Sequence, residues 1–300
     1  MNKKNLAVIY AILAAALYAV NIPLSKLLLS HAGATMMAAF LYLGAGIGLT
    51  LYGAVEMGAR RGKKPEPLTR KELPYTVAMV VLDIIAPILL MLGIAKTNSA
   101  NASLLNNFEI VATSVIAFAL FKEAISKRLL AAILMVTAAS AILSFEGAGA
   151  FTFNTGSLLV LVACLCWGFE YNCTKMISNK NSTEIVIIKG WFSGLGSLTV
   201  ALLTGETVPE PKWILAILLL GFIAYGLSIK LYIMAQKYLG AAKTSAFYSI
   251  APFLGVAFGM ILLRERPGGQ FYLALAIMLF STAVMIKDTV IREKLQEDQA

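Results

Sequence analysis

The chain has 300 residues, of which 59% are hydrophobic and 14% are charged, with a formal net charge of +9 and a mean hydropathy of +0.79. Soluble domains carry about a quarter charged residues, so this composition excludes a soluble protein and indicates an integral membrane protein in contact with the lipid bilayer. Most basic residues lie in loops beside apolar segments, where they set orientation in the membrane. The positive charge therefore does not indicate a nucleic-acid partner.

Apolar stretches recur along the whole chain, and each is long enough to cross a hydrocarbon core of about 30 Å, which takes about 20 helical residues. Ten can be placed, at residues 6–28, 34–56, 73–95, 98–121, 127–145, 155–177, 183–204, 212–236, 241–263 and 269–287. Little chain is left between them, so function has to reside in the membrane part or in short loops. The predicted fold is an all-α integral membrane protein with ten transmembrane helices.

Two stretches of the first half recur in the second half, which indicates an internal repeat. Leu17–Lys26 matches Cys166–Lys175: an aromatic, a small and an apolar residue precede a polar one, and each block ends with a hydroxyl residue and a lysine. Ser99–Glu123 likewise matches Ala241–Glu265. We therefore predict two five-helix repeats, whose bounds follow from the linker between segments five and six.

The repeats, at residues 1–146 and 147–300, each contain an odd number of helices, so the second must enter the membrane from the side opposite to the first. The repeat is therefore inverted, as in secondary transporters. Lys and Arg gather at the end shared by both termini and by the loops near 57–72, 122–128, 175–189 and 237–243. The positive-inside rule then predicts a multi-pass protein of the cell inner (cytoplasmic) membrane with both termini in the cytoplasm.

Two prolines and two uniformly apolar segments add expectations about packing. Pro87 and Pro252 each interrupt an apolar segment, so the third and ninth helices are expected to kink beside a cavity. Segments five and ten, at 127–145 and 269–287, are the most uniformly apolar. They are expected to lie outside the functional cavity, against lipid or against a second copy of the chain in a homodimer.

Four ionisable residues fall at membrane depth, where insertion of each costs at least about 2.5–3.5 kcal/mol. They are Asp83, Glu109, Glu170 and Lys230. Two alternatives stay open: Lys230 either reaches the cytoplasmic end of its helix or pairs with one buried acid, and Glu170, near the same end, either faces a cavity or is simply hydrated.

Polar and aromatic residues accompany these four at helical spacing on six or more segments, which is the lining that a central water-accessible cavity needs. The predicted substrate-binding residues are Tyr18, Asn21, Tyr42, Asp83, Asn106, Asn107, Glu109, Trp167, Glu170, Trp191, Tyr225, Lys230 and Tyr248. No cofactor or metal is expected, because the only histidine is His31, no acids and histidine have metal-ligand spacing, and no ATP-binding Gly-x-x-x-x-Gly-Lys-Ser/Thr motif occurs.

Three acids against one lysine leave the predicted interior short of positive charge. This balance favours a cationic or zwitterionic solute, such as an amine or amino acid, or one acid held neutral because burial disfavours its charged form. A carboxyl group that exchanges a proton can couple proton movement to transport. Glu109 or Asp83 is the hypothesised proton-coupling acid.

These features resemble the EamA-type members of the drug/metabolite transporter superfamily. The resemblance rests on the two five-helix halves, the blocks ending at Lys26 and Lys175, the Ala/Ser-rich starts of segments four and nine, and the closing Lys122-Glu123 and Arg264-Glu265 pairs. It implies a basket-like transporter in which helices one to four and six to nine surround a central cavity, with helices five and ten at the flank.

The sequence departs from the family pattern at one position. Pro252 matches the family's proline in helix nine, whereas the equivalent position in helix four is Ile110, preceded by Glu109. Glu109 is therefore a specific feature of this chain. Family members move amino acids, amines, nucleotide precursors, drugs and other small metabolites in either direction, so the resemblance identifies the fold better than the cargo.

The leading hypothesis is a secondary active transporter that moves a small metabolite by alternating access, with proton coupling as an option. The first alternative is an exporter of neutral metabolites or drugs without proton coupling. A channel, a flippase and a membrane-embedded enzyme are more remote. An enzyme needs a nucleophile with a base or a metal cluster, and no such set occurs beside the single histidine, so the protein is not expected to be an enzyme.

Overall fold

The computed structural model describes residues 3–59, 66–121, 126–146, 152–239, 244 and 247–297, and these residues are almost entirely helical. Seven helical stretches among them are long and apolar enough to cross a membrane, and shorter apolar helices cover Ala251–Leu262 and Gly269–Val284. This arrangement confirms an all-helical, multi-span membrane protein and is compatible with ten spans. The structure does not describe Lys122-Glu123 or the start of segment nine at 241–243.

The first repeat contains α1 (Lys3–Ala19), α2 (Asn21–Leu28), α3 (Ala34–Ala59), η1 (Arg70–Glu72), α4 (Leu73–Lys96), α5 (Ser99–Leu105), α6 (Phe108–Phe121) and α7 (Lys127–Ser144). Two short strands follow, β1 (Phe145–Glu146) and β2 (Thr152–Phe153), which pair in antiparallel fashion. The second repeat contains α8 (Thr155–Ile177), α9 (Ser182–Ile188), η2 (Lys189–Ser193), α10 (Gly194–Leu203), α11 (Pro211–Gly221), η3 (Phe222–Leu227), α12 (Ser228–Leu239), α14 (Ala251–Leu262) and α15 (Gly269–Glu297).

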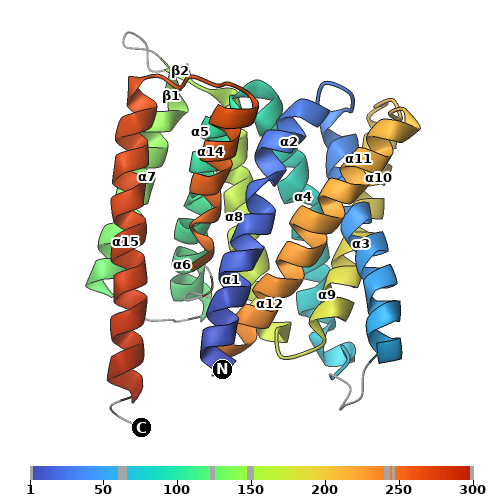
Figure 1. Ribbon diagram of the computed structural model, residues 1–300, viewed down its shortest axis with the longest axis horizontal. Coiled ribbons are helices and arrows are strands. Elements are labelled where there is room, and N and C mark those ends of the chain that lie inside the picture. The colour runs from blue at the N-terminus through green and yellow to red at the C-terminus, as the bar shows by residue number, and fades with distance from the viewer. Residues whose placement is uncertain are drawn as a thin grey trace.

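The helices form one bundle, in which the start of α1 and the end of α15 lie at one end and the β1–β2 hairpin lies at the other (Figure 1). We call these the terminal end and the hairpin end. The first helix of the first repeat, α1, runs toward the hairpin end, and α8, the first helix of the second repeat, runs back from it (Figure 1). The two repeats thus have opposite directions, as predicted from their odd number of helices.

Helices α7 and α15 lie side by side at one edge of the bundle (Figure 1) and pack mainly against each other. This is the flanking position expected of the two most uniformly apolar segments. The rest of the bundle is held together across the two repeats: α4 packs along α8, α1 along α12, and α3 along α10 and α11. The buried core therefore lies at the interface between the repeats.

Two expected helices of the first repeat are broken rather than continuous. The first breaks between α1 and α2, just before Asn21, and the fourth breaks between α5 and α6, at Asn106 and Asn107. At the second break the Asn107 N–H bonds to Leu104 O at 3.1 Å, a tight turn in place of the regular helical bond. At the first break Pro23, in the first turn of α2, has no N–H to bond a carbonyl group of α1.

The two prolines behave differently from each other. In segment nine a new helix, α14, begins at Ala251 with Pro252 in its first turn, where the missing N–H costs nothing. Helix α4 instead continues through Pro87 as one helix from Leu73 to Lys96. Of these two prolines, only Pro252 therefore lies beside a break.

Close approach of helices from the two repeats depends on paired glycines. A Cβ atom added to Gly190, in η2, would lie 2.2 Å from the backbone nitrogen of Gly46, in α3. No side chain fits between backbones at that distance. Glycine at both positions therefore allows η2 and α3 to approach each other this closely. This close approach also sets the position of Lys189, the residue before Gly190.

We predict that Gly190→Ala destabilises the folded protein by about 1–3 kcal/mol, the usual cost of overpacking, because α3 and η2 are forced apart. Thermal unfolding of the detergent-purified protein measures the effect. Gly268→Ala is the matched control, since nothing lies within 4 Å of a Cβ added there. Equal unfolding temperatures for the two variants would contradict the packing argument.

Candidate functional site

Two buried acids from different repeats meet one buried ammonium group. The Lys189 Nζ, in η2, lies 3.1 Å from Asp83 Oδ2, in α4, and donates a short hydrogen bond to Glu170 Oε1, in α8. Tyr42 Oη donates to Asp83 Oδ1 at 2.7 Å, and Thr174 donates to Glu170. No side chain of the ion triplet is more than 2% exposed. We call Asp83, Glu170 and Lys189 the charge cluster.

Lys189 was missed by the sequence analysis, which counted the region near 175–189 among the cytoplasmic loops. The structure corrects this: a helix begins at Ser182, so Lys189 lies two turns inside it and is buried. The available signal was that predicted segment 183–204 already contained this lysine. A loop lysine and a buried lysine look alike in sequence, because the two acids that compensate it come from distant helices.

The charge cluster lies where the helix of η2 changes its hydrogen bonding. Residues Lys189–Ser193 form a π-helical turn, and Phe222–Leu227 in η3 form another, which carries Tyr225. Isolated π-helical turns inside α-helices often occur at functional sites. In both cases the turn presents a polar side chain to the interface between the repeats.

Glu109 is a separate buried acid in the first turn of α6, and only 3% of it is exposed. The break at Asn106 and Asn107 leaves the start of α6 inside the membrane, where the helix dipole favours a negative charge. Tyr171 lies close to this carboxyl group. The Oε2 atom of Glu109 and the Oδ1 atom of Asn107 have no partner among the described residues.

A chain of tyrosine rings connects the surroundings of the two acid sites. Neighbouring ring centroids are 5.0–5.9 Å apart, at distances typical of aromatic pairs. The order is Tyr42, Tyr225, Tyr18, Tyr248, Tyr232 and Tyr171. Tyr42 contacts Asp83 at one end, and Tyr171 contacts Glu109 at the other. We call these six residues the tyrosine chain, and Tyr171 and Tyr232 are members that the sequence analysis did not select.

The other predicted polar residues of α1, α2 and α8 lie beside this chain. Asn21 Nδ2 donates to Tyr225 Oη at 3.3 Å, and Ser25 Oγ donates to Asn21 Oδ1 at 3.1 Å. Trp167 is 3% exposed and is a hydrogen-bond partner of Asp83. Asn106 is buried at the break between α5 and α6. The structure thus brings together most of the predicted lining residues.

Trp191 and Lys230 have their described contacts on the outer side of α3. The Trp191 indole N–H donates to Thr50 at 3.1 Å, and the Lys230 Nζ lies 3.8 Å from the centre of the Tyr52 ring. Asp83 and Glu170 pair with Lys189, and Lys230 is itself buried.

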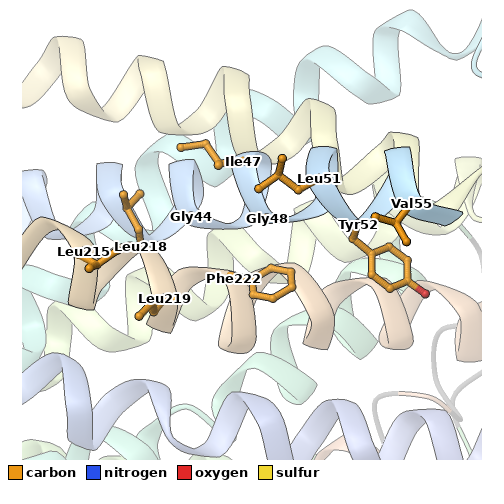
Figure 2. A pocket seen from close by; sticks show the side chains of 10 residues that line it. All are labelled: Gly44, Ile47, Gly48, Leu51, Tyr52, Val55, Leu215, Leu218, Leu219 and Phe222. Carbon is orange, nitrogen blue, oxygen red and sulfur yellow. The ribbon is translucent and has the colours of Figure 1, made fainter. Parts of the chain in front are cut away.

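Tyr52 also lines a groove of about 510 Å³ between α3 and the α11–η3 helix (Figure 2). Its lining residues are Gly44, Ile47, Gly48, Leu51, Tyr52, Val55, Leu215, Leu218, Leu219 and Phe222. Several of these side chains are more than half exposed on the outside of the bundle. The groove offers almost only apolar contacts, so it fits the hydrocarbon chains of the bilayer rather than a polar solute.

At the hairpin end, two charged side chains hold the turn between α4 and α5. The Lys26 Nζ donates to the carbonyl oxygens of Ile94 at 2.5 Å and Thr97 at 2.6 Å. The Glu265 carboxylate accepts from the backbone N–H groups of the first two residues of α5, at 2.7 and 2.8 Å. Each charge is opposite to the helix dipole that it faces. We call Lys26 and Glu265 the hairpin-end clasp.

Comparisons with known proteins agree with this architecture. The model of the EamA-like transporter family matches residues 5–145 and 154–287. The chain belongs to the EamA-like transporter family. A relative from Methanothermobacter thermautotrophicus, described as an uncharacterized transporter, is 24% identical over 264 residues, which cover 83% of this chain and 76% of the relative.

A solved crystal structure, titled only as that of a protein, is similar to this EamA-like transporter with a TM-score of 0.69. It is 16% identical, and the match covers 93% of this chain and 97% of that one. At this identity the likeness shows the fold alone. The family and the relative's description point to a transporter rather than an enzyme, and they imply a small-molecule solute and a lipid environment. Among the described residues, no group of three or more His, Cys, Asp or Glu could hold a metal ion.

The clasp of this EamA-like transporter yields a stability prediction. Glu265→Gln is expected to lower the free energy of unfolding by about 0.5–2 kcal/mol, the range for loss of a helix cap, because one charge-assisted hydrogen bond becomes neutral and the other is lost to an amide NH2 that cannot accept. Thermal unfolding measures it. Glu210→Gln is the matched control, since Glu210 precedes α11 without a side-chain cap bond. An unchanged unfolding temperature for Glu265→Gln would contradict the capping role.

Proposed function

We propose that this EamA-like protein is a secondary carrier that moves a small organic cation or zwitterion, such as an amine or amino acid, by alternating access. Its solute site comprises the charge cluster, Glu109 and the tyrosine chain between them. Proton exchange on Glu109 or Asp83 couples the transport to a proton gradient. The carrier lies in the cell inner membrane with its terminal end in the cytoplasm.

The single observation that carries this proposal is the charge balance of the buried interface between the repeats. Asp83, Glu170 and Glu109 supply three buried carboxyl groups, against two buried ammonium groups, that of Lys189 in the charge cluster and that of Lys230 at the Tyr52 ring. Burial without compensation strongly disfavours a charged carboxylate. Protons or a positively charged solute group supply what is missing, and both are the species that a coupled carrier binds.

The aromatic surroundings favour the same solute class. Faces of tyrosine rings attract cations, with about 2 kcal/mol or more gained where the cation is desolvated. The chain offers six such rings between the two acid sites, and hydroxyl groups along it can also bind the carboxyl end of a zwitterion. Helices broken at mid-depth beside the site are typical of secondary carriers, in which half-helix ends face the solute.

The hairpin-end clasp supports alternating access, because its two charged side chains join different helices to the turn between α4 and α5 at one end of the bundle. Lys26 and Glu265 have repeat counterparts in Lys175 and Glu123, which the inversion assigns to the terminal end. Lys175 ends α8 near that end, and Glu123 lies outside the described residues. In the proposed cycle the two pairs hold opposite ends of the bundle in turn.

The exposed apolar faces of α7 and α15 remain the proposed contact for a homodimer. The second candidate function, export of neutral metabolites or drugs without proton coupling, is favoured by the tyrosine chain alone, since hydroxyl groups and ring faces also suit uncharged aromatic solutes. The charge cluster has no role in that alternative.

Uptake into proteoliposomes separates these functions. A mixed pool of labelled amines, amino acids, nucleobases and organic acids is offered with and without an imposed pH gradient. The proposal expects amines or zwitterions to accumulate and the pH gradient to change their rate. Transport of multiply anionic compounds only would refute the solute class. Many ions passing per opening, or lipid scrambling without solute flux, would identify a channel or a flippase.

We predict that Glu109→Gln or Asp83→Asn abolishes the effect of the pH gradient, because the neutral amide cannot exchange a proton. The measurement is initial uptake rate with and without the gradient. Glu210→Gln, at a side chain that is 66% exposed, controls for a general effect of losing one carboxylate. If both site variants remained as pH-dependent as the original protein, neither acid would be the coupling group.

A further inference from the structure

Lys189 is buried so completely that its ammonium group depends on its two acids. The side chain is 2% exposed and reaches Asp83 in the first repeat and Glu170 in the second. An unpaired ammonium group at this depth is strongly disfavoured. The lysine therefore contributes a positive charge to the contact between the two repeats, which are the parts that move in the proposed cycle.

The charge cluster is still one positive charge short. Two carboxylates and one ammonium sum to a net charge of −1. The Oε2 atom of Glu170 is buried and has no hydrogen-bond partner among the described residues. The site thus holds a cation that is covalently part of the chain, and it has an unused acceptor oxygen that the ammonium group of a solute can reach.

We propose that Lys189 is a tethered counter-cation: its ammonium group holds the Asp83–Glu170 pair when the carrier is empty, and a primary ammonium group of the solute takes its place when the carrier is loaded. This inference rests on the proposed function and narrows the solute to a primary amine or an amino acid with a free amino group. As it is displaced, Lys189 releases its proton to the aqueous side on which the carrier is open, so no unpaired ammonium group is left at this depth. The empty and loaded sites then carry the same set of charges, which allows the repeats to move in both states.

The chemistry of lysine suits exchange better than permanent bracing. Its ammonium group is a compact charge on a flexible four-carbon stem, whereas the arginine fork holds carboxylates in two parallel hydrogen bonds. Tyr42 and Thr174 already donate to Asp83 and Glu170. These two hydroxyl donors keep the acids in place while the ammonium group that pairs with them is exchanged. The π-helical turn that begins at Lys189 adds a local backbone irregularity where the stem is attached.

The first test replaces the lysine with an arginine, whose guanidinium group should stay bound to Asp83 and Glu170. Lys189→Arg keeps the charge, so the unfolding temperature should stay within about 2 °C of the original protein. Amine uptake should fall by more than about tenfold, because the guanidinium group does not yield to the solute. Lys212→Arg, at a surface lysine that is 66% exposed, is the matched control. Unchanged amine uptake by Lys189→Arg would overturn the inference.

The second test removes the tether and supplies a free cation of the same shape. Lys189→Ala leaves out three carbons and the ammonium group, so the probe is n-propylammonium at millimolar concentration. It should raise the unfolding temperature of this variant by about 5 °C or more, whereas n-propanol, its neutral counterpart, should not. Equal shifts with the two probes would overturn the inference.

Lys189→Ala leaves two buried carboxylates without a cation, and this variant can therefore fail to fold. A second variant with fewer uncompensated charges keeps the test informative. Lys189→Ala combined with Glu170→Gln keeps the net charge of the original cluster and should show a smaller stabilisation by n-propylammonium. No stabilisation of either variant would overturn the inference. Amine uptake by the original protein together with unchanged uptake by Lys189→Arg would overturn it while leaving the proposed function intact. Absence of any amine or amino-acid uptake by the original protein would overturn the proposed function and this inference with it.

Discussion

The pairing of Lys189 with Asp83 and Glu170 is the interaction on which the rest of this structure depends. A charge inside a membrane protein is stable only with compensating partners, and here the partners come from both repeats. The contact therefore ties the two halves together electrostatically. It also creates a dependence on mobile charge, because one ammonium cannot neutralise two carboxylates and the nearby Glu109.

Packing and charge reinforce each other at this interface. The contact between Gly46 and Gly190 brings α3 and η2 to backbone distance, and this proximity carries Lys189 toward α4 and α8. Glycine at these positions removes the side chains that would separate the helices. The tyrosine chain fills the remaining space with rings that are rigid and polar only at one end. A buried polar site is compatible with close packing for this reason.

The inverted repeat does not produce a symmetric site. Both repeats contain a broken helix, but the first contributes Glu109, whereas the second contributes the π-helical turns and Lys189. The columns that match in sequence, such as Asn21 and Glu170, have different partners in the structure: a tyrosine for the first and a lysine for the second. The two repeats thus have related backbones, and differences at single matched positions make the two sides of the site chemically different.

Sequence by itself determined the membrane class, the positions of the apolar segments, the opposite direction of the two repeats and most of the buried polar residues, because hydropathy and repeat patterns are local. Asp83, Glu109, Glu170 and the tyrosines at 18, 42, 225 and 248 were all recognisable as polar groups at membrane depth. Which of them touch was decided only by tertiary structure. Lys189 was taken for a loop lysine, since burial of a lysine depends on acids that lie 19 and 106 positions away. Lys230, which was recognised at membrane depth, is buried.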